Sequence, residues 1–192
     1  MDNFSETDLK RIVDEVVSGL MREMPSRITP APETNSRPVP APDFEKGKIV
    51  AIGADHGGFP MKENLKIYLE ENGYQVYDCG TNSTDAVDYP DFAKAVAQQV
   101  SSGKAWRGVM IDGAGIGSCM AANKVAGVRA AMCYDYATAS NSREHNNANL
   151  LTLGAGLIGP SLAKQILTTF LETEFGGGRH AGRVDKIMEI EK

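Results

Sequence analysis

From Lys48 to the C-terminus, the apolar residues alternate between short continuous runs and longer segments at helical spacing. The short runs predict strands at Ile49–Ile52, Gln75–Tyr77, Gly108–Ile111, Arg129–Cys133 and Leu150–Leu153. The longer segments predict helices at Met61–Asn72, Pro90–Ser101, Ala137–Glu144 and Leu162–Thr173, with another helix that ends near Lys124. Such alternation favours a parallel sheet covered by helices on both faces. Residues 48–192 are therefore predicted to form a three-layer α/β/α Rossmann-like domain with about five parallel strands.

The first 47 residues follow a different pattern. Apolar residues recur three and then one position apart from Leu9 to Met24, which predicts one stripe of an amphipathic helix. Ser5 and Asp8 resemble a capping box at its start, and Pro25 ends it. Residues 25–47 hold six of the nine prolines, a composition that favours an extended, solvated linker. The sequence thus predicts a helix over 1–24, a proline-rich linker over 25–47 and a domain over 48–192.

Two interpretations of the N-terminal helix remain open. It packs on its own domain or a sister subunit, or it docks on another protein. The long tether favours the second interpretation, because a helix that packs on its own domain needs no such spacer. The arrangement resembles the encapsulation peptides that bring enzymes into bacterial microcompartments, with residues 5–24 as the segment that contacts a shell protein. The mixed charges of the polar face argue against a helix that lies on a membrane surface.

Composition narrows the choice of partners and cofactors. A net charge of −5 argues against nucleic-acid binding, which needs a basic face. The three cysteines have no CxxC spacing and the three histidines are far apart, so neither a zinc site nor a disulfide framework is predicted. No apolar run approaches the roughly 20 residues that span a bilayer. These features fit a cytoplasmic protein without a metal.

The clearest candidate for chemistry is the turn after the third predicted strand, Ile111–Ser118, with the sequence IDGAGIGS. Glycines in such a turn can direct successive N–H groups at an oxyanion or a phosphate, although a packed strand-to-helix turn has the same pattern. The turn lacks the GxGxxG and GxxxxGK[ST] spacings of nucleotide-binding loops. Asp55 and His56 follow the first strand, either as an acid/base pair or as a helix cap beside a surface histidine.

Two further groups complete the candidates. His145 lies in the polar run Ser142–Asn147, where a histidine at a helix end is often structural. Arg179 and Arg183 are four residues apart and could grip a phosphate from one helical face, or remain solvated charges. Ligands of parallel α/β domains bind beyond the carboxyl ends of the strands. Because we place each candidate group after a predicted strand or in the C-terminal tail, we expect the groups to meet at that edge.

Five motifs in order carry a resemblance to a known family. They are GADHGG at the first strand, DYPDFA at 88–93, IDGAGIGSCMAANK at 111–124, SREHNNAN at 142–149 and GGRHAGRV at 177–184. Their order and spacing resemble the family of type B ribose-5-phosphate isomerase, allose-6-phosphate isomerase and galactose-6-phosphate isomerase. The resemblance covers essentially all of 48–192 and none of 1–47.

The resemblance implies a metal-free aldose–ketose isomerisation of a phosphorylated sugar through a cis-enediolate, without a cofactor. It also implies that two subunits of a homodimer or tetramer share each pocket. The base must take a carbon-bound proton, and the oxyanion that forms must be stabilised. The implied phosphate ligands are His56, Arg179 and Arg183. The implied groups around the sugar are His145 for ring opening, Asp55 and Asn146 at hydroxyls, Tyr89 on the pocket wall, and Gly113, Gly115, Gly117 and Ser118 near the enediolate.

The departures from the family pattern bear on the base. Asp112 stands where many relatives have the catalytic cysteine, and Ser118 stands where others have a glutamate. Cys119 is one residue further, about 100° around a helix, so we do not expect it to substitute. Ala114 replaces a threonine or serine that assists proton movement. The pattern is most similar to the A subunit of galactose-6-phosphate isomerase, which works with a different second subunit.

Three interpretations follow from these departures. In the first, which we favour, Asp112 is the base, since a desolvated carboxylate can deprotonate a carbon next to a carbonyl. In the second, the chain binds a sugar phosphate but needs a partner subunit or is catalytically weak. In the third, the domain is scaffold or cargo with a degenerate site.

Overall fold

A computed structural model of the chain describes residues 48–191, together with 7, 10–11, 14–16 and 18. The chain divides into two units, Met1–Ala41 and Pro42–Lys192. All described residues of the first unit are helical and exposed. The rest of the predicted helix and the proline-rich segment lie outside the described residues, so the boundaries 1–24 and 25–47 stay predictions.

The second unit is built on a five-stranded parallel sheet, as the sequence predicts. The strands are β1 (Ile49–Ala54), β2 (Gln75–Asp78), β3 (Arg107–Asp112), β4 (Ala130–Met132) and β5 (Leu150–Gly154). Their order across the sheet is β2-β1-β3-β5-β4, so β1 and β3 are central and β2 and β4 form the edges. Every residue of β1 is apolar or glycine, and so is every residue of β3 between its terminal Arg107 and Asp112. Such sequences are expected of strands buried on both faces.

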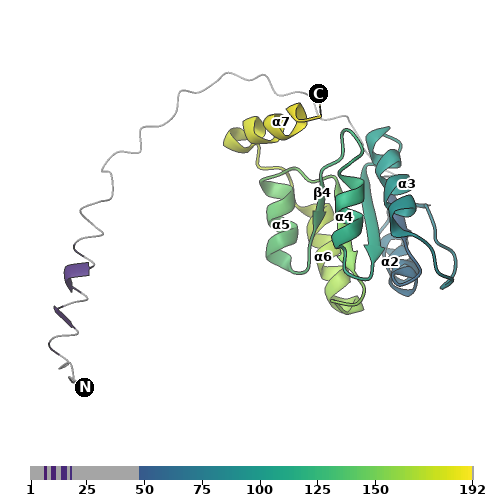
Figure 1. Cartoon of the computed structure of the whole chain (residues 1–192), viewed down its shortest axis with the longest axis horizontal. Coiled ribbons are helices and arrows are strands. Elements are labelled where there is room, and N and C mark those ends of the chain that lie inside the picture. The colour runs from purple at the N-terminus through teal and green to yellow at the C-terminus, as the bar shows by residue number, and fades with distance from the viewer. Residues whose placement is uncertain (1–6, 8–9, 12–13, 17, 19–47, 192) are drawn as a thin grey trace. The chain divides into compact units, whose positions relative to one another are not determined.

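Helices cover both faces of this sheet (Figure 1). They are α2 (Phe59–Glu71), α3 (Tyr89–Ser101), α4 (Ile116–Ala122), α5 (Tyr136–Glu144), α6 (Pro160–Glu172) and α7 (Ala181–Glu189), with a 3-10 turn η1 (Gly178–His180) before the last. The sequence pattern predicted every strand and helix up to α6 to within a few residues. It did not predict η1 or α7, whose apolar positions, Val184, Ile187 and Met188, span little more than one turn.

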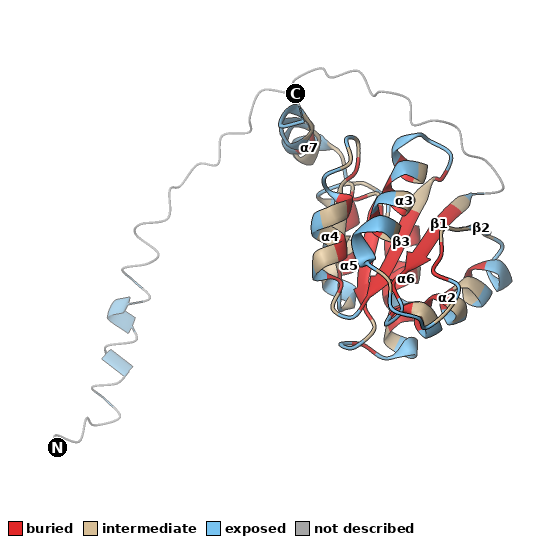
Figure 2. Ribbon diagram, turned by 45° about the vertical axis from the view of Figure 1, so that its right-hand side comes forward, coloured by how far each residue is buried: buried red, intermediate tan, exposed pale blue. Residues whose placement is uncertain are grey.

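One apolar core lies on each face of the sheet. Figure 2 shows the buried residues gathered in the strands between the helix layers. Residues Val50, Ile52, Val109 and Ile111 point to one core, which α2, α5 and α6 close. The alternate residues Ala51 and Met110 point to the other core, which α3 and α4 close. The alternation follows from the two-residue period of a strand. None of the described helices is long and apolar enough to cross a membrane.

Candidate functional site

The chain changes direction across the sheet between β1 and β3. From β1 it passes through α2 to β2 on one side, whereas β3 leads through α4 to β4 on the other. Such a switch point opens a crevice beyond the carboxyl ends of the two strands, where ligands of open α/β sheets bind. Asp55 follows β1 and Asp112 ends β3, and the register that pairs Ala54 with Ile111 makes them neighbours. The two carboxylates therefore mark the crevice.

Asp112 is 4% exposed, and both of its carboxylate oxygens accept hydrogen bonds from its own loop. Oδ1 accepts from the N–H of Ala114 at 2.9 Å and from that of Gly115. Oδ2 accepts from the N–H of Ser118 at 3.1 Å and from the hydroxyl of the same residue. Ser118 is completely buried. A carboxylate offers about four lone-pair sites, and these four donors occupy all of them. The sequence did not predict this role of Asp112 as the internal cap of the glycine loop.

Asp55 is also buried, at 8% exposure, but it is bonded differently. Its Oδ1 accepts from the N–H of Gly58 at 2.8 Å, in the turn that leads into α2. A Cβ at Gly58 would lie 2.4 Å from the carbonyl oxygen of Ile111, so only glycine lets the turn pass this close to β3. The neighbouring His56 is exposed, and its Nδ1 lies 3.3 Å from the N and 3.2 Å from the O of Val87. The two residues thus present an acid and an imidazole at the same turn.

Tyr89 covers the glycine loop from the start of α3. A Cβ at Gly117 would lie 2.5 Å from the tyrosine ring, so glycine at this position makes room for the ring. Sequence reasoning placed Tyr89 on the pocket wall, and the structure brings it to the edge that holds Asp112. Cys119, the residue after Ser118, does not face Asp112. Its Sγ contacts the edge of β4, 3.4 Å from the carbonyl oxygen of Ala130. Burial raises the pKa of the Cys119 thiol, although several hydrogen bonds oppose the shift.

A buried ion pair anchors the segment between β2 and Tyr89. The ammonium group of Lys62, which is completely buried, lies 2.8 Å from Oδ1 of Asp78, and Lys66 lies 2.6 Å from Oδ2. Asp78 also accepts from the N–H of Gly80. Burial acts to raise the pKa of Asp78, but the hydrogen bonds from Lys62, Lys66 and Gly80 outweigh it and lower the pKa. The loop after β2, whose Val87 contacts His56, is therefore held in place at Asp78, where it begins.

His145 belongs to a second group of residues, at the C-terminal end of α5. Its ring stacks on that of His180, with the centroids 4.3 Å apart and the planes 5° from parallel. Asn141 lies one turn earlier, with its Nδ2 2.8 Å from Nδ1 of His145, and its Oδ1 lies 3.3 Å from Nδ2 of Asn146. With the Asn141 amide in this orientation, Nδ1 accepts and Nε2 carries the proton. Sequence reasoning missed Asn141, although its i, i+4 spacing to His145 was a visible signal.

Arg179 and Arg183 lie next to this histidine pair. Arg179 is in η1 beside His180, and Arg183 is exposed on α7. Their positive charges, together with removal from water and the charge on His145, lower the pKa of His180, with removal from water as the largest cause. The arrangement fits the predicted phosphate grip, because two guanidinium groups next to two imidazoles concentrate positive charge and hydrogen-bond donors.

The structure corrects the expectation that all candidate groups meet at one edge. Helix α5 runs antiparallel to the strands, so its end at His145 lies at the amino edge of the sheet, opposite to Asp112. Leu150 at that edge is four residue steps along β5 from Gly154, the partner of Asp112, which corresponds to about 13 Å. Figures 1 and 2 both show α7 beyond one end of the layered domain. We therefore distinguish the aspartate edge (Asp55, His56, Tyr89, Asp112) from the arginine edge (Arg129, His145, Asn146, Arg179, Arg183).

Three half-buried or buried arginines raise the positive potential at the arginine edge. Burial, and then the charges of Arg143 and Arg129, lower the pKa of Arg107 to about 9. Burial likewise lowers the pKa of Arg143 to about 10 and lowers that of Arg129. The Nε of Arg107 is the one buried side-chain nitrogen or oxygen without a hydrogen-bond partner in the part of the chain that the structure describes. Several arginines close together at one edge favour a bound anion nearby.

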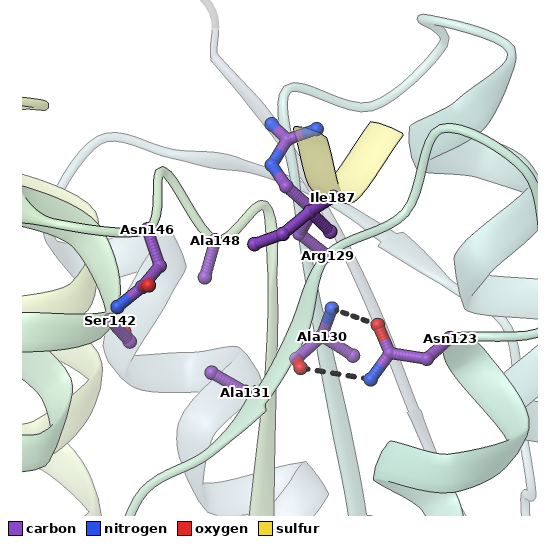
Figure 3. A pocket seen from close by; sticks show the side chains of 8 residues that line it. All are labelled: Asn123, Arg129, Ala130, Ala131, Ser142, Asn146, Ala148 and Ile187. Atoms are coloured by element: carbon purple, nitrogen blue, oxygen red, sulfur yellow. Dashed lines mark hydrogen bonds between the residues drawn. The ribbon is translucent and has the colours of Figure 1, made fainter. Parts of the chain in front are cut away.

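A pocket of about 230 Å³ opens beside the edge strand β4, between α4, α5 and α7. Figure 3 shows Ala130, Ala131 and Ala148 on its apolar floor, with Asn146 and Ser142 on one wall. On the opposite wall, Asn123 pairs with the outward-facing backbone of Ala130 by accepting from its N–H and donating to its carbonyl. The side chain of Asn123 thus takes the place of a neighbouring strand, and it protects the open edge of β4.

Several exposed apolar side chains lie on α4, α5 and α7 or next to them, the helices on either side of this pocket. They are Ile116 and Met120 on α4, Tyr134 and Tyr136 before and in α5, and Ile187 and Ile190 on and after α7. Exposed apolar patches of this kind mark interaction surfaces. No group of three or more potential metal ligands was found among the described residues.

Comparisons with known proteins agree on one family. Residues 50–187 match the Ribose/Galactose Isomerase family. The chain is 42% identical over 145 residues to ribose-5-phosphate isomerase B of Escherichia coli, covering 76% of this chain and 97% of that protein. It is 43% identical over 139 residues to D-erythrulose-4-phosphate isomerase of Pectobacterium atrosepticum, covering 72% of this chain and 91% of that protein.

Solved structures give the same result. Ribose-5-phosphate isomerase B of Clostridium thermocellum superimposes with a TM-score of 0.74 at 50% identity, covering 74% of this chain and 97% of that one. The enzyme of Mycoplasma genitalium, solved with bound ribulose-5-phosphate, has a TM-score of 0.74 at 40% identity, covering 77% and 98%. The parallel sheet, the two polar edges and these matches lead to one conclusion: the chain belongs to the ribose/galactose isomerase family and is a sugar-phosphate isomerase.

Proposed function

We propose that this protein interconverts an aldose and a ketose phosphate, ribose 5-phosphate and ribulose 5-phosphate or a related pentose or hexose phosphate, through a cis-enediolate. The relatives support this range, since their names include a ribose-5-phosphate and an erythrulose-4-phosphate isomerase. The single observation that carries the proposal is the pair of neighbouring carboxylates, Asp55 and Asp112, at the switch point of the sheet. A carboxylate that is shielded from water can move a proton next to a carbonyl.

The second part of the proposal is that two copies of the chain build each site. The aspartate edge contains the two acids, but His56 is its only predicted phosphate ligand. The arginine edge contains the two predicted phosphate-binding arginines and His145. These groups lie at opposite edges of one sheet, so they can surround one small sugar only if a second copy supplies one of the two sets. The exposed apolar patch around β4 supports a homodimer or tetramer, because pairing would bury it.

Within the shared site, Arg179, Arg183 and His56 hold the phosphate. His145 opens the sugar ring, and the contact with Asn141 supports this role because it keeps the proton on Nε2, where it can pass to the ring oxygen. Asn146 and Tyr89 contact the sugar. The assignment of Asp112 as the base stays a prediction: it requires that one of its four donors moves away when substrate binds.

A screen of the purified full-length protein in D₂O tests the reaction. The panel is ribose 5-phosphate, allose 6-phosphate, galactose 6-phosphate and erythrulose 4-phosphate, and NMR detects deuterium at the carbon next to the carbonyl. We expect incorporation with at least one sugar, and its loss in the matched Arg179→Ala/Arg183→Ala variant. Absence of incorporation with every sugar would favour the alternative, a binding or scaffold protein or a chain that needs a different subunit.

We also propose that the protein is cytoplasmic and is cargo of a bacterial microcompartment, with residues 5–24 bound to a shell protein. The amphipathic stripe and the proline-rich linker of the sequence support this proposal. Deleting residues 1–24 should leave activity and oligomer size unchanged and abolish co-assembly with shell protein. Val13→Glu on the stripe should do the same, whereas Glu15→Gln on the polar face should not. A smaller oligomer after the deletion would contradict the proposal and favour packing on a sister subunit.

A further inference from the structure

The two carboxylates of the aspartate edge differ in the lone pairs that they can offer. A group that removes a carbon-bound proton needs a lone pair that no other donor occupies. Each carboxylate oxygen of Asp112 accepts from two donors, so all of its roughly four lone-pair sites are occupied. Two of these donors come from Ser118, which is completely buried. A substrate proton can reach Asp112 only if this loop first rearranges.

Asp55 has an oxygen that is not used in this way. Its Oδ1 accepts from Gly58, and its Oδ2 has no donor among the described residues. This oxygen is not sealed from solvent, because Arg107 Nε is the one fully buried side-chain nitrogen or oxygen of the described residues that lacks a partner. Oδ2 therefore reaches accessible space at a residue that is otherwise 8% exposed. The exposed His56 is the next residue of the turn, so this space adjoins a predicted phosphate ligand.

We propose that Asp55 is the base of the isomerisation and that Asp112 is a positioning residue that holds the glycine loop in shape. The inference rests on the proposed function. Asp55 Oδ2 takes the proton from C2 of the open-chain aldose, the C–H electron pair forms the C1=C2 double bond, and the carbonyl pair moves to O1. Asp55 then returns the proton to C1 while the proton of the O2 hydroxyl passes to O1, which leaves the ketone at C2.

Asp55→Asn tests the assignment with little disturbance of the fold. The Oδ1 of asparagine can still accept from Gly58, so the turn and the melting temperature should be preserved. Loss of the base should lower kcat by about 10³-fold and abolish deuterium incorporation, with a much smaller change in KM. The exposed Asp91→Asn, on α3, is the matched control and should behave as wild type.

Asp112→Asn should have the opposite profile. Asparagine has one oxygen and a donating NH₂ group, which would face the N–H or the hydroxyl of Ser118, so the melting temperature should fall. Measurable deuterium exchange should remain, because the base is still present. The assignment is overturned if Asp55→Asn keeps wild-type kcat, or if Asp112→Asn abolishes exchange with an unchanged melting temperature and sugar-phosphate affinity.

The same measurements separate this inference from the proposed function. If the wild-type protein exchanges no deuterium with any sugar of the panel, the proposed function fails and the assignment of Asp55 fails with it. If the wild type is active and Asp55→Asn is equally active, the proposed function stands and Asp55 alone is excluded.

Discussion

The two edges of the sheet are built in contrasting ways. At the aspartate edge the acids are buried, and backbone N–H groups fix them within turns that only glycine can form. At the arginine edge Arg179 and Arg183 are exposed, and they stand on η1 and α7, outside the layered core. The aspartate edge is therefore suited to hold a reacting group in place, whereas the arginine edge is suited to bind a charged ligand. Neither edge alone contains both the buried acids and the pair of exposed arginines.

The largest effect should come from mixing variants of the two edges. Asp55→Asn and the double variant Arg179→Ala/Arg183→Ala should each be almost inactive. After unfolding and refolding of an equimolar mixture, half of the dimers are mixed and each has one intact site, so about a quarter of wild-type activity should return. Steady-state kinetics on the mixture measures this. No recovery, with mixed dimers confirmed by mass spectrometry, would show that one copy supplies both edges.

A single change at the arginine edge should weaken the grip and spare the chemistry. Arg183→Lys keeps the charge but loses the planar fork that binds a phosphate through two hydrogen bonds. We expect KM to rise about 10-fold, equivalent to roughly 1.4 kcal/mol, while kcat changes little. Lys186→Arg, on the same helix, is the control. A fall in kcat without a change in KM would mean that Arg183 belongs with the reacting groups.

The rigidity of the aspartate edge should depend on the Lys62–Asp78 pair. Asp78→Asn leaves the buried Lys62 with the more exposed Glu63, 3.0 Å away, as its remaining carboxylate partner, which should lower the free energy of unfolding by up to about 3 kcal/mol at pH 7. Lys62→Met should cost about 1 kcal/mol or less, since Asp78 keeps Lys66 and a methionine fills the space. Urea unfolding with each variant measures the two values. Equal losses would contradict a role for the buried charge.

The sign of the pH dependence follows from the lowered pKa of Asp78. The contribution of its ion pairs is fully present above the unfolded pKa of about 4 and is lost as the pH falls through the lower folded pKa. The stability difference between wild type and Asp78→Asn should therefore shrink in acid and stay constant above about pH 5. A difference that grows in acid would exclude this origin.

The smallest effect should be seen at His180. Removal from water and the charges of His145, Arg179 and Arg183 lower its pKa. A phosphate bound between the arginines offsets these charges, so the pKa should rise when inorganic phosphate is added. NMR titration of the histidine ring protons measures the shift. The Arg179→Ala/Arg183→Ala variant should show none, and a downward shift in the wild type would place the phosphate elsewhere.

The sequence alone was enough to predict the layered fold, and it named the candidate residues that the structure places at the two edges. Continuous apolar runs such as Gly108–Ile111 are typical of strands buried on both faces, and their alternation with helical stripes favours parallel crossovers. Helix α7 was not predicted because its apolar positions, Val184, Ile187 and Met188, span little more than one turn. The glycines after β1 and β3 were visible as turns, but their close contacts with Ile111 and Tyr89 were not.

Only the tertiary structure decided how the site residues are grouped. The residues around His145 predict the end of a helix, but they do not show at which edge of the sheet that helix ends. The separation of His145 from Asp112 became clear only from the direction of α5 relative to the sheet. Likewise, the sequence shows Asp55 and Asp112 as two similar acids after strands. Their difference depends on which backbone N–H groups reach each oxygen, and the fold of the turns sets that.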